Sequence, residues 1–356
     1  MVRAPVPERD VSLSSNAERL RNVFRHPLIP VLVVIVILLL FGRILSPGFL
    51  GMANIGNILA TSTILALAGL GQTFVIIGGG EGIDLSVGAL VSLGAILGGA
   101  FSNGVNAGLL PALGLLILLG GFVGFLNGMG VQWIGVPPLV MTLGMASVVD
   151  GFALAYTNGQ PTGGAPPVLL SIGTGHLFGD IRWLIPMGIV IAIIGYLVLN
   201  RSRFGHQLQL VGNNRQAARL SGLPLRNIII ASYIIAGIAS ILAGVLLLGY
   251  AGSSDLQIGN SYTLLSIAAV VIGGTKLTGG EGSYIGTVLG AMALIVLTNV
   301  LVAMKLPEGA REVLEGLALV AILVAYTRRR GAHRQSRRPR MLANTLKGEA
   351  QKWKSE

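Results

Sequence analysis

Residues 183–199, WLIPMGIVIAIIGYLVL, and residues 227–249, NIIIASYIIAGIASILAGVLLLG, are two apolar runs joined by a polar loop. The loop, residues 200–226, reads NRSRFGHQLQLVGNNRQAARLSGLPLR and contains five arginines and no acid. Each run is long enough, at about 1.5 Å per residue, to cross most of a bilayer core of about 30 Å. The pattern indicates two membrane helices with a basic connection at which a partner can dock.

The rest of the chain has the same character. Of its 356 residues, 53% are hydrophobic and only 11% are charged, whereas soluble domains carry about 25% charged residues. Long apolar runs recur where a β-barrel would show short alternating segments. The 52 glycines favour close helix packing, broken helices, or both. We therefore expect an all-α, polytopic membrane protein with about ten transmembrane helices, some of them short or broken.

Hydropathy divides the chain into three parts: a cytoplasmic N-terminal segment with a surface helix (1–27), a transmembrane domain (28–327) and a basic cytoplasmic tail (328–356). The eighth predicted span is short and ends in GGTKLTGGEG (273–282), which favours a half-helix that stops inside the membrane. If short segments re-enter, the number of spans falls to eight. The ten predicted spans are 28–45, 54–78, 83–102, 109–131, 138–157, 183–200, 226–249, 262–275, 284–304 and 311–327.

Basic residues gather on one side of this topology. Twenty of the 25 lysines and arginines fall in 1–27, 200–226 and 328–356, which share a face when the number of spans is even. Because positive residues favour the cytoplasmic side, both termini and the 200–226 loop are predicted to be cytoplasmic. The net charge of +11 is then a topology signal that also contacts anionic lipid, rather than a sign of nucleic-acid binding.

Two stretches echo each other. Residues 75–88 read VIIGGGEGIDLSVG, and residues 271–286 read VIGGTKLTGGEGSYIG. Each runs from an apolar helix through glycines and GEG to a polar cap and a new helix, and on this topology both descend to the cytoplasmic side. Paired glycine-interrupted helices are common in transporters with duplicated halves, although glycine bias alone can also produce two matches this simple.

No catalytic or metal-binding pattern is present. Cysteine is absent and the four histidines are scattered, so the spacing of a metal site is not met. Neither a phosphate-binding loop nor a nucleophile with its base stands out. The sequence predicts that this chain catalyses no reaction and binds no metal or cofactor itself.

Few ionisable residues lie in or near the predicted spans, where a charge is costly. Asp84, with Ser86, opens the third span, and Glu281, with Ser283, opens the ninth. Each acid can cap its helix, the interpretation we favour, or contact a substrate or gate.

Polar and aromatic side chains in or beside spans offer hydrogen bonds and stacking surfaces to a polar solute. Taken singly, each is explained as readily by interhelical hydrogen bonding or interfacial anchoring. The candidate pathway or gate residues are Asp84, Asn127, Thr142, Tyr156, Asn158 and Asn299.

Four motifs resemble the membrane permease subunits of ribose-type ABC sugar importers, in the branched-chain amino acid/sugar permease superfamily. The resemblance covers about residues 28–327 and implies a second permease subunit, cytoplasmic ATPase subunits that hold ATP and Mg²⁺, and an extracytoplasmic sugar-binding protein. The motifs are GEGIDLSVGA (80–89), LVMTLGMASVVDGFALAYTNGQP (139–161), VGNNRQAARLSGL (211–223) and IAAVVIGGTKLTGGEGSYIGTVLGA (267–291). Lys276 and Glu81 depart from the pattern of the family, and they can pair with each other or with lipid.

The resemblance also implies that part of the 200–226 loop is a short coupling helix that sits in a groove of the ATPase. Local chemistry fits a helix over 213–221: either asparagine at its start can cap it, two alanines permit close approach, and Gly222 with Pro224 ends it. The implied coupling residues are Gly212, Asn213, Asn214, Ala217, Ala218, Arg219 and Gly222.

Two other classes of protein remain as alternatives. A secondary transporter driven by protons or sodium would work without an ATPase, but the acids that it needs are sparse and the basic loop would have no role. A membrane-embedded enzyme would need a reactive constellation, which is lacking.

Overall fold

The computed structural model describes residues 28–160, 163–179, 181–307, 309–311, 313–318 and 320–321. The predicted surface helix in 1–27 and the basic tail at 328–356 lie outside these residues. The chain divides into two units, Met1–Met304 and Lys305–Glu356, and each is considered by itself.

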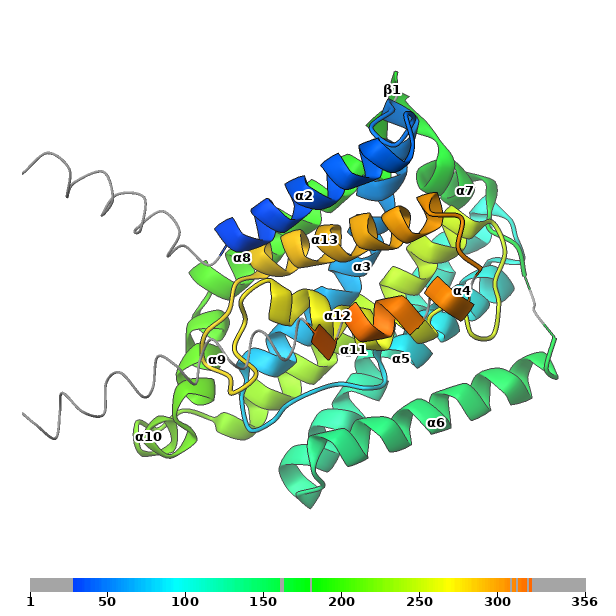
Figure 1. Ribbon diagram of the computed structural model, residues 1–356. Coiled ribbons are helices and arrows are strands. Elements are labelled where there is room, and N and C mark those ends of the chain that lie inside the picture. The colour runs from blue at the N-terminus through cyan, green and yellow to red at the C-terminus, as the bar shows by residue number, and fades with distance from the viewer. Residues whose placement is uncertain are drawn as a thin grey trace, which may run out of the picture. The chain divides into compact units, whose positions relative to one another are not determined.

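The first unit is almost entirely helical, which confirms the all-α prediction (Figure 1). Its helices are α2 (Ile29–Leu45), α3 (Met52–Ile77), α4 (Val87–Ser102), α5 (Asn106–Met129), α6 (Pro138–Thr157), α7 (Pro167–Thr174), α8 (Leu184–Arg201), α9 (Arg203–Asn213), α10 (Arg215–Leu220), α11 (Leu225–Ala251), α12 (Asn260–Ile272) and α13 (Tyr284–Ala303). A π-helical turn, Gly130–Ile134, extends α5, and a hairpin of β1 (His176–Phe178) and β2 (Ile181–Arg182) precedes α8.

Nine of the ten predicted spans correspond to helices among the described residues. Six of these helices are long and apolar enough to cross a membrane, and α2, α4 and α12 are shorter apolar helices. The eighth span is short as predicted, because α12 has only 13 residues. Of the last predicted span, 311–327, the structure describes helical residues at 311, 313–318 and 320–321 in the second unit.

Helix α11 is the centre of the first unit and contacts α3, α4, α5 and α7. Its backbone lies directly against that of α5, since a Cβ added at Gly120 would overlap the Gly237 carbonyl oxygen, and one at Gly237 would overlap the Gly120 carbonyl oxygen. Small residues allow this approach in membrane helices, where van der Waals packing replaces the hydrophobic effect. The glycine content therefore serves close packing.

Helix α3 is enclosed by helices that come much later in the chain. In its most apolar window, 89% of the residues are buried, and it packs on both α11 and α13. Two polar contacts tie it to α13: the hydroxyls of Thr73 and Thr287 are 2.8 Å apart, and the Tyr284 hydroxyl donates to the Ala66 carbonyl at 3.0 Å. In contrast, α6 and α8 expose most of their apolar residues.

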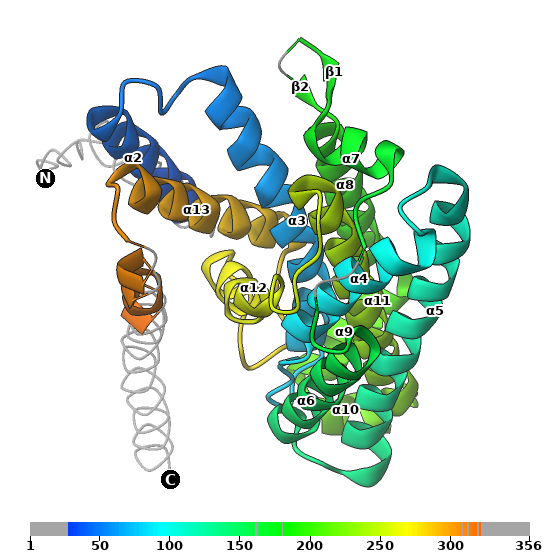
Figure 2. The same cartoon turned by 90° about the vertical axis from the view of Figure 1, so that its right-hand side faces the viewer.

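Three short helices and the hairpin lie at the ends of the unit. The hairpin and α7 lie at one end, and α9 and α10 lie at the opposite end (Figure 2). The loop from α3 to α4 and the loop from α12 to α13 lie on the side of α9 and α10 (Figure 1). The two echoing sequences thus face the same side of the protein, as their topology predicted.

Candidate functional site

The short helix predicted in the basic loop is present as α10 (Arg215–Leu220). Of the two candidate capping residues, Asn214 caps it: its Oδ1 accepts a hydrogen bond from the Ala217 N–H at 3.0 Å. At the other end, Gly222 has φ +77°, and the Leu223 N–H donates to the Ala218 carbonyl at 3.1 Å. This is the Schellman arrangement, which favours glycine at its left-handed position.

The two faces of α10 differ sharply. Ala218 is 4% exposed and packs in an apolar cluster with Leu208 and Val211 of α9. Leu220 is 84% exposed, and Ala217 and Arg219 are exposed beside it. The face available to a partner is therefore formed by Ala217, Arg219 and Leu220, while Ala218 fastens the helix to its own chain.

Sequence reasoning missed α9, which it treated as loop. Ser202 caps α9 by accepting a hydrogen bond from the Gly205 N–H at 3.0 Å. Leu208 and Val211, three residues apart, are buried, and Phe204 stacks on Phe74 of α3 with ring centroids 6.0 Å apart. The three-residue spacing of Leu208 and Val211 in an otherwise polar stretch could have predicted this helix, because it is the spacing of one face of an amphipathic helix.

Three of the predicted pathway residues meet around the loop between α3 and α4. Asp84 Oδ1 accepts hydrogen bonds from the Ser86 N–H at 2.8 Å and the Ser86 hydroxyl at 2.6 Å. The Asn127 amide of α5 donates to Ser86 Oγ at 2.9 Å. Thr142 of α6 accepts from the Leu85 N–H at 3.0 Å. All four polar side chains are buried.

Gln72 of α3 contacts the backbone of the same loop. In the orientation of its amide that satisfies both contacts, the Gln72 nitrogen lies 3.1 Å from the Asp84 carbonyl oxygen and the Gln72 oxygen lies 3.3 Å from the Asp84 nitrogen. Among the described residues, Asp84 Oδ2 and Asn127 Oδ1 have no hydrogen-bond partner. The loop is thus held by α3, α5 and α6, and two buried acceptors, one on the loop and one on α5, are unused in this conformation.

The capping interpretation of the two acids needs correction. Helix α4 begins at Val87, not near 83, and Ser86 occupies the cap position without a side-chain cap. Asp84 instead orders the turn before the helix. Ser283 does cap α13, accepting from the Gly286 N–H at 3.3 Å, but Glu281 forms an ion pair with Lys276.

The other pathway candidates lie elsewhere. Tyr156 is near the opposite end of α6 from Thr142, about 21 Å away at the helical rise per residue, in ring contact with Phe101 and Phe152. Asn158 is exposed and ends α6 in a left-handed conformation. The Asn299 amide donates to the Ile295 carbonyl of its own helix at 2.8 Å. These residues form no single site in the described conformation.

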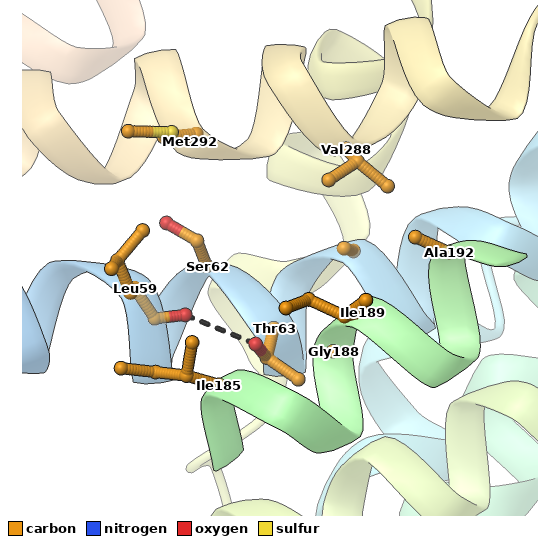
Figure 3. Close-up of a pocket in the computed structure, with 10 residues that line it drawn as sticks. Leu59, Ser62, Thr63, Ile185, Gly188, Ile189, Ala192, Val288 and Met292 are labelled. Atoms are coloured by element: carbon orange, nitrogen blue, oxygen red, sulfur yellow. Dashed lines mark hydrogen bonds between the residues drawn. The ribbon is translucent and has the colours of Figure 1, made fainter. Parts of the chain in front are cut away.

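A cavity of about 150 Å³ lies between α3, α8 and α13 (Figure 3). Its walls are largely apolar, and Thr63 turns its hydroxyl back to the Leu59 carbonyl at 3.0 Å. A sugar requires several converging hydrogen-bond partners. This cavity therefore does not have the chemistry of a carbohydrate site.

Packed apolar helices, a loop held by buried polar contacts and a capped helix exposed at one end define a polytopic helical membrane protein. The chain belongs to the family described as the permease component of the branched-chain amino acid transport system, whose model matches residues 54–323.

Curated relatives agree with this assignment. The chain is 33% identical over 298 residues to the autoinducer 2 import system permease protein LsrC of Escherichia coli O9:H4 strain HS, covering 83% of this chain and 85% of the relative. It is 34% identical over 298 residues to the ribose import permease protein RbsC of Bacillus subtilis strain 168, covering 81% and 89%. No solved structure gave a match.

Proposed function

We propose that this chain is the transmembrane subunit of an ATP-driven ABC importer that moves a monosaccharide or a related small polar solute into the cell. The membership of the permease family supports the general class, and the relatives named for import of ribose and autoinducer 2 support the kind of solute. The observation that carries the ATP-driven mechanism is α10, a capped helix with an exposed face on an arginine-rich loop.

The partners follow from this mechanism. A second permease subunit, identical or related, completes the membrane pathway, and an extracytoplasmic binding protein delivers the solute. Separate ATPase subunits bind ATP and Mg²⁺ on the side of α10. The chain lies in the bacterial inner membrane, and the positive-inside rule supports a cytoplasmic position for that side and for both termini.

Transport proceeds by alternating access. Closure of the ATPase pair moves α10, and the membrane helices reorient to accept solute from the binding protein. The side chains of Asp84, Asn127 and Thr142 are fully buried in the described conformation, where a solute cannot reach them. This buried group therefore contributes to the pathway or gate only once the α3–α4 loop has moved. An ion-driven transporter is the competing mechanism, and it predicts uptake without any ATPase.

A matched pair of leucines tests the docking face. Leu220 of α10 is 84% exposed and Leu210 of α9 is 57% exposed. Leu220→Ser should weaken co-purification with the ATPase about tenfold or more, because an exposed leucine that fills a groove acts as an anchor. Leu210→Ser is the control and should bind like the unsubstituted chain.

Uptake in proteoliposomes should require the ATPase subunits and ATP. Uptake that persists without them and collapses with the ion gradient would contradict the proposal.

A further inference from the structure

Three glycine-containing segments meet beside α10. They are the end of α3 with the following loop (77–82), the junction of α9 and α10 (212–215) and the loop before α13 (279–282). The Gly280 N–H donates to the Ile77 carbonyl at 2.9 Å, which joins the first segment to the third. We call these three segments the glycine junction.

The backbones of the glycine junction touch without intervening side chains. A Cβ added at Gly212 would overlap the Ile77 carbonyl oxygen and crowd the Gly280 nitrogen, and one at Gly279 would overlap the backbone of Gly79. Close-packed contacts of this kind are difficult to compress, so displacement of one segment displaces its neighbours.

Arg215, the first residue of α10, links that helix to the first loop. Its Nη2 donates to the Gly79 carbonyl at 2.8 Å and lies 3.5 Å from the Gly78 carbonyl oxygen. The guanidinium packs so closely over Gly80 that a Cβ there would overlap it. Burial lowers the pKa of Arg215, yet arginine stays charged at neutral pH. A cation that donates to backbone carbonyls forms a strong, directional contact.

Asn213 links the same segment to the second loop. Its amide nitrogen donates to the Gly280 carbonyl at 3.3 Å. Two residues at the junction of α9 and α10 thus hold two different loops. Arg215 holds the loop that leads to α4 and that also contacts α5 and α6, and Asn213 holds the loop that leads to α13.

We propose that Arg215 and Asn213 are positioning residues that transmit movement of α10 to the two glycine loops by separate contacts. Arg215 moves the α3–α4 loop, and with it the buried group of Asp84, Asn127 and Thr142. Asn213 moves the α12–α13 loop. The inference rests on the proposed function, since it takes α10 as the helix that the ATPase moves.

The absence of cysteine from the sequence makes a site-directed spin-label test direct. Single labels are placed at Gln216→Cys on α10, Glu81→Cys on the first loop and Thr278→Cys on the second, all at exposed positions. The full chain is reconstituted with its ATPase, and spectra are compared with and without ATP, Mg²⁺ and vanadate. In the otherwise unsubstituted chain, all three labels should respond.

The two substitutions should give a crossed result. Arg215→Ala should reduce the response at position 81 about tenfold, a size within the range of coupling between sites. It should lower the response at 278 much less, because the packed backbones still join the loops, and should spare 216. Asn213→Ala should lower the response at 278 more than that at 81 and should spare 216. Arg215→Lys, which keeps a donor and the charge, should restore part of the response at 81. Arg203→Ala, at the exposed first residue of α9, is the control and should change none of the three.

Other outcomes overturn the inference in distinguishable ways. If Arg215→Ala leaves the response at position 81 intact, or lowers positions 81 and 278 equally, Arg215 does not act through a separate contact. If the ATPase fails to co-purify with the unsubstituted chain and position 216 does not respond, the proposed function fails first, and the inference falls with it.

Discussion

The loop between α3 and α4 and the loop between α12 and α13 share a sequence pattern but are held in different ways. Both leave a helix at a glycine pair, contain GEG and enter a new helix after a serine. The first, residues 78–86, is fixed by buried neutral side chains of α3, α5 and α6 and by its own buried acid, Asp84. The second, residues 273–283, is closed on itself by the ion pair of Lys276 and Glu281, whose side chains are 35% and 61% exposed. It contacts its neighbours through the backbone of Gly279 and Gly280.

The difference teaches which loop is more firmly fixed to the helix bundle. Breaking a buried hydrogen bond leaves an unsatisfied polar group and costs about 1–3 kcal/mol, whereas an exposed ion pair contributes about 0–1 kcal/mol. The glycine pattern therefore sets the shape of both loops, and the residues around them set their stiffness. Three substitutions separate these contributions.

The largest effect is expected where both loops are disturbed together. Gly212→Ala places a Cβ against both the Ile77 carbonyl oxygen and the Gly280 nitrogen. Overpacking against backbone should destabilise the chain by about 3 kcal/mol, measured as a lower Tm in detergent by size-exclusion chromatography after heating. Gly114→Ala, with open space at its Cβ, is the control and should be neutral or slightly stabilising. An unchanged Tm for Gly212→Ala would show that the loops are not in close contact.

An intermediate effect is expected when only the first loop loses support. Thr142→Val removes the acceptor for the Leu85 N–H but keeps the shape of the side chain. The unsatisfied N–H should cost about 2 kcal/mol and speed hydrogen exchange at Leu85, while exchange in residues 273–283 stays constant. Ser147→Val is the matched control in α6, because its hydroxyl is exposed and bonds only within its own helix, to Leu143. If hydrogen exchange at Leu85 is the same in both variants, the Thr142 hydroxyl does not stabilise the first loop.

The smallest effect is expected when only the second loop is changed. Lys276→Ala breaks the exposed ion pair with Glu281 and should cost less than about 1 kcal/mol. The loss should shrink further as salt is raised, because salt screens exposed charges. A chemical-denaturation series at low and high ionic strength measures both. If Lys276→Ala lowers the free energy of unfolding more than Thr142→Val does, the second loop is fixed more firmly than the first.

Much of the fold was predictable because the bilayer imposes simple rules on long segments. Helices such as α11 must satisfy their backbone internally and present apolar side chains throughout, so their sequences are easy to recognise. Helices α7 and α9 and the β1–β2 hairpin escaped prediction because they are short. Helices α7 and α9 are also stabilised by packing on neighbours that are distant in sequence.

The candidate site also has some features that the sequence predicted and others that it did not. A cap at Asn213 or Asn214 and a stop at Gly222 follow from neighbouring residues and were predicted, and the structure shows that Asn214 is the cap. The role of Asp84 was not, because its network reaches Asn127 and Thr142, which are separated from the loop by 41 and 57 positions along the chain. The exposure of Leu220 was equally hidden, since a leucine in a helix is normally assigned to the core. The placement of coupling and pathway residues in the working importer stays a prediction.

The enclosure of α3 has a consequence for biosynthesis. Its main partner α11 ends at Ala251, 174 residues after Ile77, so at about 5–20 residues per second α3 waits roughly 9 to 35 s for it. Throughout that interval the Thr73 hydroxyl has no Thr287 to contact, and the Ala66 carbonyl has no Tyr284 hydroxyl from which to accept. The mean hydropathy of 1.7 in its most apolar window suits α3 to residence in lipid meanwhile. Helix α3 must therefore be stable by itself in the bilayer during synthesis, before later helices enclose it.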